Sequence, residues 1–284
     1  MTVAVDYKKT PDLPHQFLTQ QNGLLAIKLL CRITRALQKH RGASVACLDG
    51  DIKFAPKVLG LQGEIGKYLQ VLEQFNRRNA GLLPVNIVEM VFGEWATIVD
   101  GWQKDEVVQN YEFHCHLIEV VRKLQRTVIN EYLMTPLSDK ESAFRQEFEA
   151  SLVALTNTIE TIAKLRGLAT HIAEVETRHN DLYMRMVFLL KMVVQETSGL
   201  YHLLQDLEGV SSRLSGLNHL ALQQTKTQTL VALIQSDIVD SDTVTASPDA
   251  IFEQATAIID IYWKILDQSI ALTEDCIYQS FTDG

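Results

Sequence analysis

The sequence predicts an all-α protein made of two up-down four-helix bundles packed side by side. Apolar residues recur every three and four positions almost continuously from Phe17 onward, which is the period of an amphipathic helix. Only 14 glycines and 6 prolines occur in 284 residues, and this scarcity of chain breakers favours long helices over short strands. The strongest boundary, TPLSDKES, divides the predicted helices into two sets of four. One irregular array of eight helices is the alternative.

The first four helices are expected between an N-terminal extension, residues 1–16, and the central boundary. Pro56 is compatible with the second helix because it falls in the first turn, and Pro84 can likewise occupy the first turn of the third. The segments NRRNAGLLP and GWQKDE separate the later helices. We therefore assign residues 17–135 to the first bundle, with helices expected at 17–48, 52–77, 84–102 and 107–133.

The second bundle is assigned to residues 136–284. Pro136 ends the preceding helix, and Ser138 with Glu141 forms a capping box for the next one. The polar stretch SDIVDSDTVTASP has no helical period and predicts a loop, after which Ser247 caps the last helix. The helices of this half are expected at 139–174, 181–207, 213–235 and from Pro248 onward.

The net charge and the cysteines indicate which partners and which cellular compartment to expect. The formal net charge of −9 gives no global basic surface for nucleic acid, and the basic segment RKLQR, residues 122–126, is interpreted as a solvated helix face. No stretch is apolar enough for a membrane span, and the N-terminus has no apolar signal-peptide core. The four cysteines form no CxxC pair, which suits free thiols in a reducing compartment. We expect a cytoplasmic protein that binds neither membrane nor nucleic acid.

The sequence contains no motif that indicates an enzyme or a cofactor. GxSxG, P-loop and GxGxxG patterns are absent. His114 and His116 in FHCHLI would point about 200° apart on a helix, so they cannot chelate one metal ion together. We therefore expect a protein that is not an enzyme and holds no metal or other cofactor.

An Arg-Gly pair interrupts the apolar row of the first helix in each half. Arg41 lies on the row of the first helix and Arg166 on the row of the fifth, each towards the C-terminal end of its helix. This recurrence indicates an internal duplication. The apolar positions of the two rows are Leu29, Ile33, Leu37, Val45 and Leu48, and Leu155, Ile159, Ile162, Ala169 and Ala173.

A guanidinium removed from water needs an acceptor, because its burial costs several kcal/mol and arginine keeps its proton. One explanation is a pair of internal salt bridges. The other is a small planar oxyanion, such as nitrate, held between the bundles by Arg41 and Arg166, with Gly42 and Gly167 permitting close approach of a backbone or ligand. The candidate salt-bridge partners are Glu64 and Glu73 in the first half and Glu196 or Glu208 in the second.

The segments LQKHRGAS and IAKLRGLA, together with FHCHLI, resemble the nitrate- and nitrite-sensing (NIT) domain. The resemblance implies two four-helix bundles with nitrate or nitrite bound between them by arginines from both, which match Arg41 and Arg166 here. A second basic residue beside the first arginine corresponds to His40. A further basic residue, expected on a later helix of the second bundle, is assigned to Lys226, with Arg213 as the second choice.

The resemblance also implies a regulatory role in signal transduction. Domains of this family usually precede an output module, but too few residues follow the last predicted helix to form one. Signalling is therefore expected to pass through an unknown protein partner or a homodimer. The alternative hypothesis is a helical scaffold or adaptor without a small-molecule ligand, in which the buried arginines form internal salt bridges.

Overall fold

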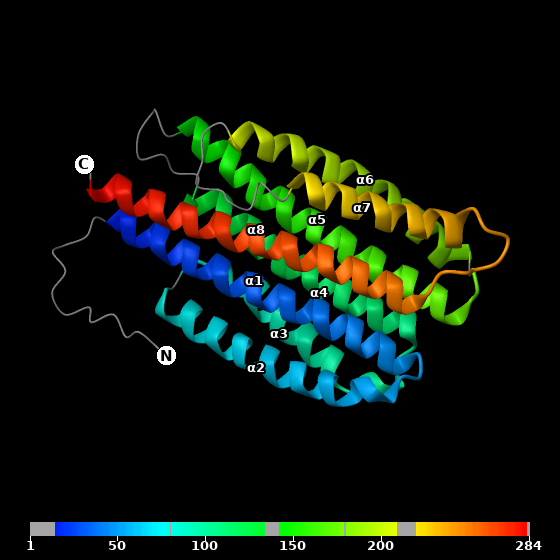
Figure 1. Ribbon diagram of the computed structural model, residues 1–284. Coiled ribbons are helices and arrows are strands. Elements are labelled where there is room, and N and C mark those ends of the chain that lie inside the picture. The colour runs from blue at the N-terminus through cyan, green and yellow to red at the C-terminus, as the bar shows by residue number, and fades with distance from the viewer. Residues whose placement is uncertain (1–14, 80, 134–141, 179, 209–219, 283–284) are drawn as a thin grey trace.

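The computed structural model describes residues 15–79, 81–133, 142–178, 180–208 and 220–282. Every regular element in these ranges is a helix, which confirms the all-α prediction (Figure 1). The main helices are α1 (His15–Leu48), α2 (Ala55–Arg78), α3 (Val85–Val99), α4 (Val107–Val128), α5 (Ser142–Val175), α6 (Asn180–Glu208), α7 (Leu220–Ile234) and α8 (Pro248–Thr282).

Short helical segments extend or join these helices. Two are 3-10 turns, η2 (Ile52–Phe54) and η3 (Trp102–Lys104), and two are π-helical turns, η4 (Ile129–Leu133) and η6 (Gln235–Val239). The last one corrects the sequence analysis, which placed a loop from Ser236 onward. The chain stays helical through Val239 because the side chain of Ile238 is fully buried and keeps this turn packed on the core.

Two predicted helix starts agree with the structure. Ser247 caps α8, since its Oγ accepts a hydrogen bond from the backbone N–H of Ala250 at 3.3 Å. Pro56 lies in the first turn of α2. The capping box of Ser138 and Glu141 and most of the N-terminal extension lie outside the described residues.

Consecutive main helices run in opposite directions along one common axis (Figure 1). The helix α1 packs mainly against α2 and α4, and α3 packs against α4. In the second half α5 packs against α6 and α8, while α7 packs against both of these neighbours. These contacts are consistent with the predicted four-plus-four arrangement, and we call α1–α4 the first group and α5–α8 the second.

The two groups meet where α1 lies beside α5 and α8, and where α4 lies beside α5. Buried hydrophobic residues form one continuous cluster across this contact, from Phe17 to Ile277. The residues of both predicted apolar rows are buried, apart from the partly buried Leu48 at the end of α1. The groups therefore share one core.

Two ion pairs cross the α1–α8 contact near the surface. Lys28 Nζ lies 2.6 Å from Glu274 Oε2, and Arg35 Nη2 lies 3.0 Å from Asp267 Oδ2. All four side chains are at least partly exposed, so each pair contributes at most about 1 kcal/mol to stability.

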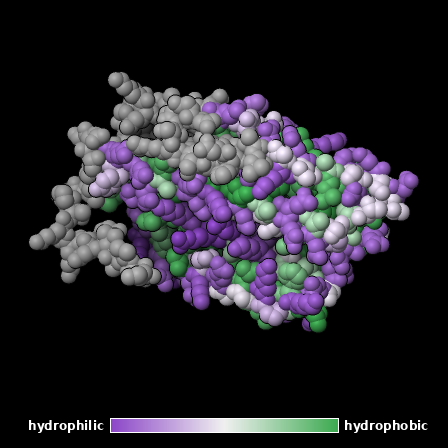
Figure 2. Space-filling model, viewed as in Figure 1, coloured by the Kyte–Doolittle hydropathy of each residue, from purple (hydrophilic) through white to green (hydrophobic). Residues whose placement is uncertain are grey.

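Most of the surface visible in Figure 2 is hydrophilic, with hydrophobic residues in several separate patches. None of the helices in the described ranges combines the length and apolar composition needed to span a bilayer.

Candidate anion site between the helix groups

Arg41 forms a buried ion pair that joins the two helix groups. Its Nη1 lies 2.7 Å from Oε1 of Glu160 on α5, and its Nη2 lies 3.4 Å from the second carboxylate oxygen. The two side chains are only 2% and 1% exposed. Nη1 also approaches Cys115 Sγ at 3.1 Å, and the guanidinium lies 5.3 Å from the ring centroid of Tyr111. Residues of α4 thus complete the surroundings of this pair.

Glu160 accepts a further hydrogen bond that extends the network to a third helix. Gln38 Nε2 donates to Glu160 Oε2 at 2.8 Å, and the indole N–H of Trp263 on α8 donates to Gln38 Oε1 at 3.3 Å. Burial alone would raise the pKa of Glu160, but the charge and hydrogen bonds of Arg41 hold this pKa below its usual value. Burial also disfavours the charged form of Arg41, but the nearby carboxylate of Glu160 raises the pKa of Arg41 above its usual value. Both groups are therefore ionised at neutral pH.

The prediction that Arg41 pairs with Glu64 or Glu73 on α2 was wrong. Glu64 accepts a hydrogen bond from Tyr68 Oη at 2.9 Å, and Glu73 forms an ion pair with Arg77 at 2.6 Å. Both glutamates lie on the solvent-facing side of α2, because the apolar face of that helix is turned to the core.

Glu160 was missed by the sequence analysis, although its position carries a signal. It directly follows the buried Ile159, and it precedes Ala163 by three residues and Gly167 by seven. This spacing places it on the same helical stripe as Gly167. A carboxylate inside such an apolar segment has to find a cation.

Arg166 on α5 is the second buried arginine, only 6% exposed. Its Nη1 donates a hydrogen bond to Thr256 Oγ1 at 2.8 Å, and its guanidinium lies 4.9 Å from the ring centroid of Phe252. Both of these partners belong to α8. The contacts are those of a neutral hydroxyl and an aromatic ring, so neither neutralises the charge.

Within the described residues, no carboxylate oxygen lies at ion-pair distance from Arg166. The expected pair with Glu196 on α6 does not form, and the side chain of Glu208 lies outside the described residues. Burial and the nearby positive charge of Arg41 lower the pKa of Arg166 to about 10. The charges of Glu160 and of the exposed Asp260 act in the opposite direction, from beyond ion-pair distance. Arg166 is therefore a protonated, buried cation at neutral pH, and no described carboxylate pairs with it directly.

The two glycines that follow the arginines differ in what they contact. A Cβ at Gly167 would lie 2.9 Å from a ring carbon of Tyr111, so the glycine makes room for this α4 side chain. A Cβ at Gly42 would lie 3.5 Å from Nη2 of Arg166 and 3.7 Å from the Phe252 ring, which is ordinary contact. The close approach expected at these positions is thus made by protein side chains.

A cavity of about 140 Å³ lies where α1 and α5 end and α8 begins. Both Arg-Gly pairs line it, so the structure brings together Arg41, Gly42, Arg166 and Gly167 as predicted. Thr170 also lines the cavity, and its buried Oγ1 has no hydrogen-bond partner in the described part of the chain. This hydroxyl and the Arg166 guanidinium are donors available to a ligand.

Four carboxylates line the same cavity. Asp51, Glu174 and Asp249 are exposed, while the partly buried Asp49 accepts a hydrogen bond from His171 Nδ1 at 2.9 Å. The buried arginines therefore mark the inner end of the cavity, and the acidic side chains surround its opening.

The basic residue predicted beside Arg41 does not reach the cavity. His40 Nδ1 lies 2.6 Å from His114 Nε2, and the His40 ring lies edge-on to Trp95 on α3. Because the backbone oxygen of Asn110 can only accept, His114 Nδ1 carries the hydrogen, and His40 donates to its other ring nitrogen. Burial lowers the pKa of His40 to about 4, so the side chain is neutral at pH 7.

The other predicted basic residues do not complete the site either. Lys226 is exposed on α7 and does not line the cavity. Arg213 lies outside the described residues. The structure therefore supplies two arginines at this cavity, one of them already paired.

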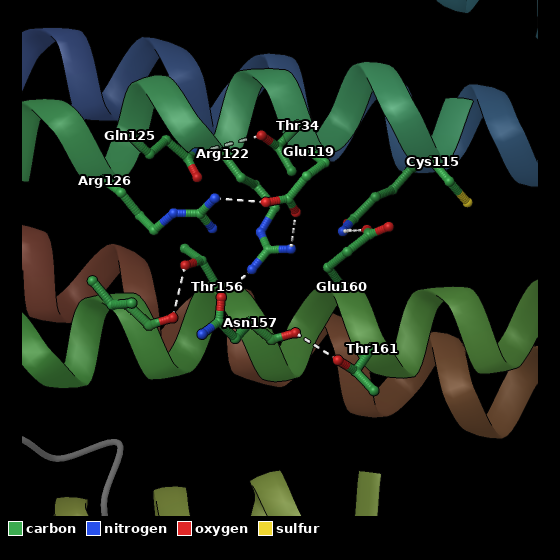
Figure 3. A network of polar contacts seen from close by, with 12 residues as sticks. Thr34, Cys115, Glu119, Arg122, Gln125, Arg126, Thr156, Asn157, Glu160 and Thr161 are labelled. Atoms are coloured by element: carbon green, nitrogen blue, oxygen red, sulfur yellow. Dashed lines mark hydrogen bonds and ion pairs between the residues drawn. The ribbon is translucent and has the colours of Figure 1, made fainter. Parts of the chain in front are cut away.

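A second, partly buried polar network lies between α4 and α5 (Figure 3). Arg122 donates to Glu119 Oε2 at 2.8 Å and also to Asn157, and Arg126 donates to Glu119 Oε1 at 2.6 Å. Arg122 is buried, so its assignment to a solvated helix face was wrong. Its charge pairs with Glu119 on the same helix, and its hydrogen bond to Asn157 reaches the second group.

His114 and His116 face opposite sides of α4, as predicted. His114 is buried, whereas His116 is exposed and lies 2.9 Å from Glu94 on α3. No group of three potential metal ligands occurs among the residues that the structure describes.

Comparisons of the chain with protein-family models, curated proteins and solved structures found no significant match. The resemblance to NIT domains stays a prediction from LQKHRGAS and IAKLRGLA. A functional proposal has to rest on the contacts around Arg41 and Arg166.

Gly167→Ala should destabilise the protein, whereas Gly42→Ala should not. Alanine at 167 collides with the buried Tyr111 ring, and overpacking of this kind costs about 1–3 kcal/mol. At 42 the added methyl has room, and the better helix propensity contributes up to about 1 kcal/mol. Urea denaturation of both variants measures the difference, and equal stability of the two would contradict the close Tyr111 contact.

Glu160→Gln should lower the free energy of unfolding by about 3–5 kcal/mol, because it leaves Arg41 buried without a charge partner. Glu73→Gln is the control, since it removes an exposed pair worth at most about 1 kcal/mol. Chemical denaturation at pH 7 measures both changes. A loss at Glu160 as small as that at Glu73 would show that Arg41 finds another acceptor.

His40→Asn should reduce the loss of folding stability that occurs as the pH falls below neutral. The folded pKa of about 4 lies below the ordinary 6.5, so unfolding takes up a proton as the pH falls between these values. Between pH 6.5 and pH 5 the loss amounts to about 2 kcal/mol, at 1.36 kcal/mol per pKa unit. Asparagine keeps a donor towards His114 but does not titrate. Denaturation curves at pH 7 and pH 5 measure the slope, which the exposed control His202→Asn should leave unchanged.

Proposed function

We propose that the protein is a cytoplasmic small-anion sensor that binds nitrate or nitrite in the cavity beside Arg166. The observation that carries this proposal is a buried cation at the wall of a cavity, with no carboxylate at ion-pair distance among the described residues. Keeping such a charge unpaired costs several kcal/mol, and an anion that enters offsets this cost. The planar, two-pronged guanidinium suits a planar oxyanion.

The residues around the cavity would have distinct roles. Arg166 supplies the charge that attracts the anion, and the free hydroxyl of Thr170 donates a hydrogen bond. Arg41 adds positive potential, but Glu160 already occupies its donors. The anion is therefore held mainly by the second group, and Glu160 takes the place that sequence analysis gave to a nitrate bridging both arginines.

Binding can be coupled to signalling because the cavity walls come from both groups. Its lining includes residues of α1 in the first group and of α5 and α8 in the second. An anion that contacts all three helices stabilises only the arrangement that brings them together. The signal would then pass to a protein partner or to a second copy of the chain.

The alternative function is a helical scaffold or adaptor without a small ligand. The Arg41–Glu160 pair favours it, because that hypothesis predicts a buried arginine in an internal salt bridge. It leaves Arg166 without a comparable partner, which is why the sensor is preferred.

Nitrate or nitrite should raise the unfolding temperature more than chloride or sulfate at matched ionic strength. A ligand at about 100 times its Kd adds about 2.7 kcal/mol, or roughly 5–10 °C for a chain of this size. Arg166→Met should remove this increase. Without ligand it should leave stability unchanged or raise it, because it removes a desolvated and unpaired cation.

Lys226→Met is the control, since it removes an exposed cation away from the cavity and should preserve the nitrate response. An equal response to all four salts would overturn the sensor and favour the scaffold. A nitrate-specific response that survives in Arg166→Met would place the site elsewhere.

A further inference from the structure

The cavity is larger than nitrate or nitrite requires. Its volume of about 140 Å³ is close to that of an engineered apolar cavity of about 150 Å³ that holds benzene. A small oxyanion at Arg166 would leave part of this space unfilled. The natural occupant is therefore expected to extend from the inner end towards the opening.

The inner end is suited to a carboxylate. A carboxylate can accept two hydrogen bonds from one guanidinium and another from a hydroxyl. Arg166 is more than nine-tenths buried and has no carboxylate partner within the described residues, while Thr170 Oγ1 has no hydrogen-bond partner there. Among the described residues, Thr170 Oγ1 therefore has no acceptor, and the Arg166 guanidinium bonds a neutral hydroxyl and no carboxylate.

The opening is suited to a cation. Asp49, Asp51, Glu174 and Asp249 all line it, and a simple anion would have to pass these four carboxylates. Glu174 lies in the last turn of α5 and Asp49 directly follows α1, where the helix dipole disfavours acids. His171 donates a hydrogen bond to Asp49, but no described residue forms an ion pair with Glu174 or Asp249.

Apolar side chains also line the cavity. Val45, Phe54 and Phe252 contribute to the lining, together with the small residues Ala46 and Ala163. Such walls suit a short hydrocarbon segment between two charged groups.

We propose that the cavity binds an aliphatic amino acid in its zwitterionic form. Its carboxylate accepts hydrogen bonds from Arg166 and Thr170, its hydrocarbon lies against the apolar walls, and its ammonium group faces the acidic opening. This inference rests on the proposed anion site at Arg166 and deepens it by naming a larger ligand class. Nitrate and nitrite then occupy only the inner end.

The test compares each amino acid with the acid that lacks its amine. Calorimetric titrations of the full chain would use glycine, β-alanine, 4-aminobutyrate, 5-aminovalerate and 6-aminohexanoate, paired with acetate, propionate, butyrate, valerate and hexanoate. At least one amino acid should bind tenfold or more tightly than its paired acid. The chain length that binds best reports the separation of the two ends.

Variants separate the contributions of the two ends. The double variant Glu174→Gln with Asp249→Asn should reduce the affinity for the best amino acid to that of its paired acid, without weakening nitrate binding. Arg166→Met should abolish binding of both ligands. Asp242→Asn, which removes an exposed carboxylate outside the cavity lining, should change neither. Far-UV circular dichroism checks that each variant keeps its helices.

The failures of the two proposals are distinguishable. If nitrate binds but no amino acid binds better than its paired acid, the zwitterion is wrong and the anion sensor stands. If an amino acid binds through Arg166 and nitrate does not, the zwitterion is supported and the nitrate sensor is overturned. Binding of neither ligand overturns both.

Discussion

The relative placement of the helix groups depends on the ion pair between Arg41 and Glu160. Both side chains are removed from water, a loss that is tolerated only with close geometry and satisfied hydrogen bonds. Gln38 supplies one of those bonds and is itself held by Trp263. Because these residues come from α1, α5 and α8, one polar network sets how three helices meet. A displacement that separated the pair would expose two buried charges to an apolar environment.

The same network leaves the two buried arginines in different surroundings. Both line the cavity at the contact between the groups, and in the described part of the chain the one carboxylate at ion-pair distance belongs to Arg41. Arg166 is left with a hydroxyl and an aromatic ring. The two Arg-Gly pairs thus lie in different surroundings, one arginine paired with the protein's own carboxylate and the other bound to a hydroxyl and an aromatic ring.

Periodicity alone predicted most of the helices and the burial of both arginines, because these depend on local spacing. The partner of Arg41 could not be found this way, because Glu160 lies on a helix that is far away in the sequence. The apolar spacing around Arg41 does not indicate which residue of another helix will pack against it. His40 was misassigned for a geometric reason: successive residues on a helix point about 100° apart, so a neighbour of Arg41 faces α3 and α4. The acidic opening gathers residues from three chain segments and has no continuous sequence signal.

The contact between α1 and α8 has unequal strength along its length. Along the middle of α1 it is bridged by Lys28–Glu274 and Arg35–Asp267, partly exposed pairs that solvent and salt weaken. Closer to the cavity it adjoins the buried Arg41–Glu160 network, which solvent does not reach. The shared apolar core continues through the same contact. Added salt would therefore weaken the ion pairs at the surface of this contact and leave the buried pair and the core in place.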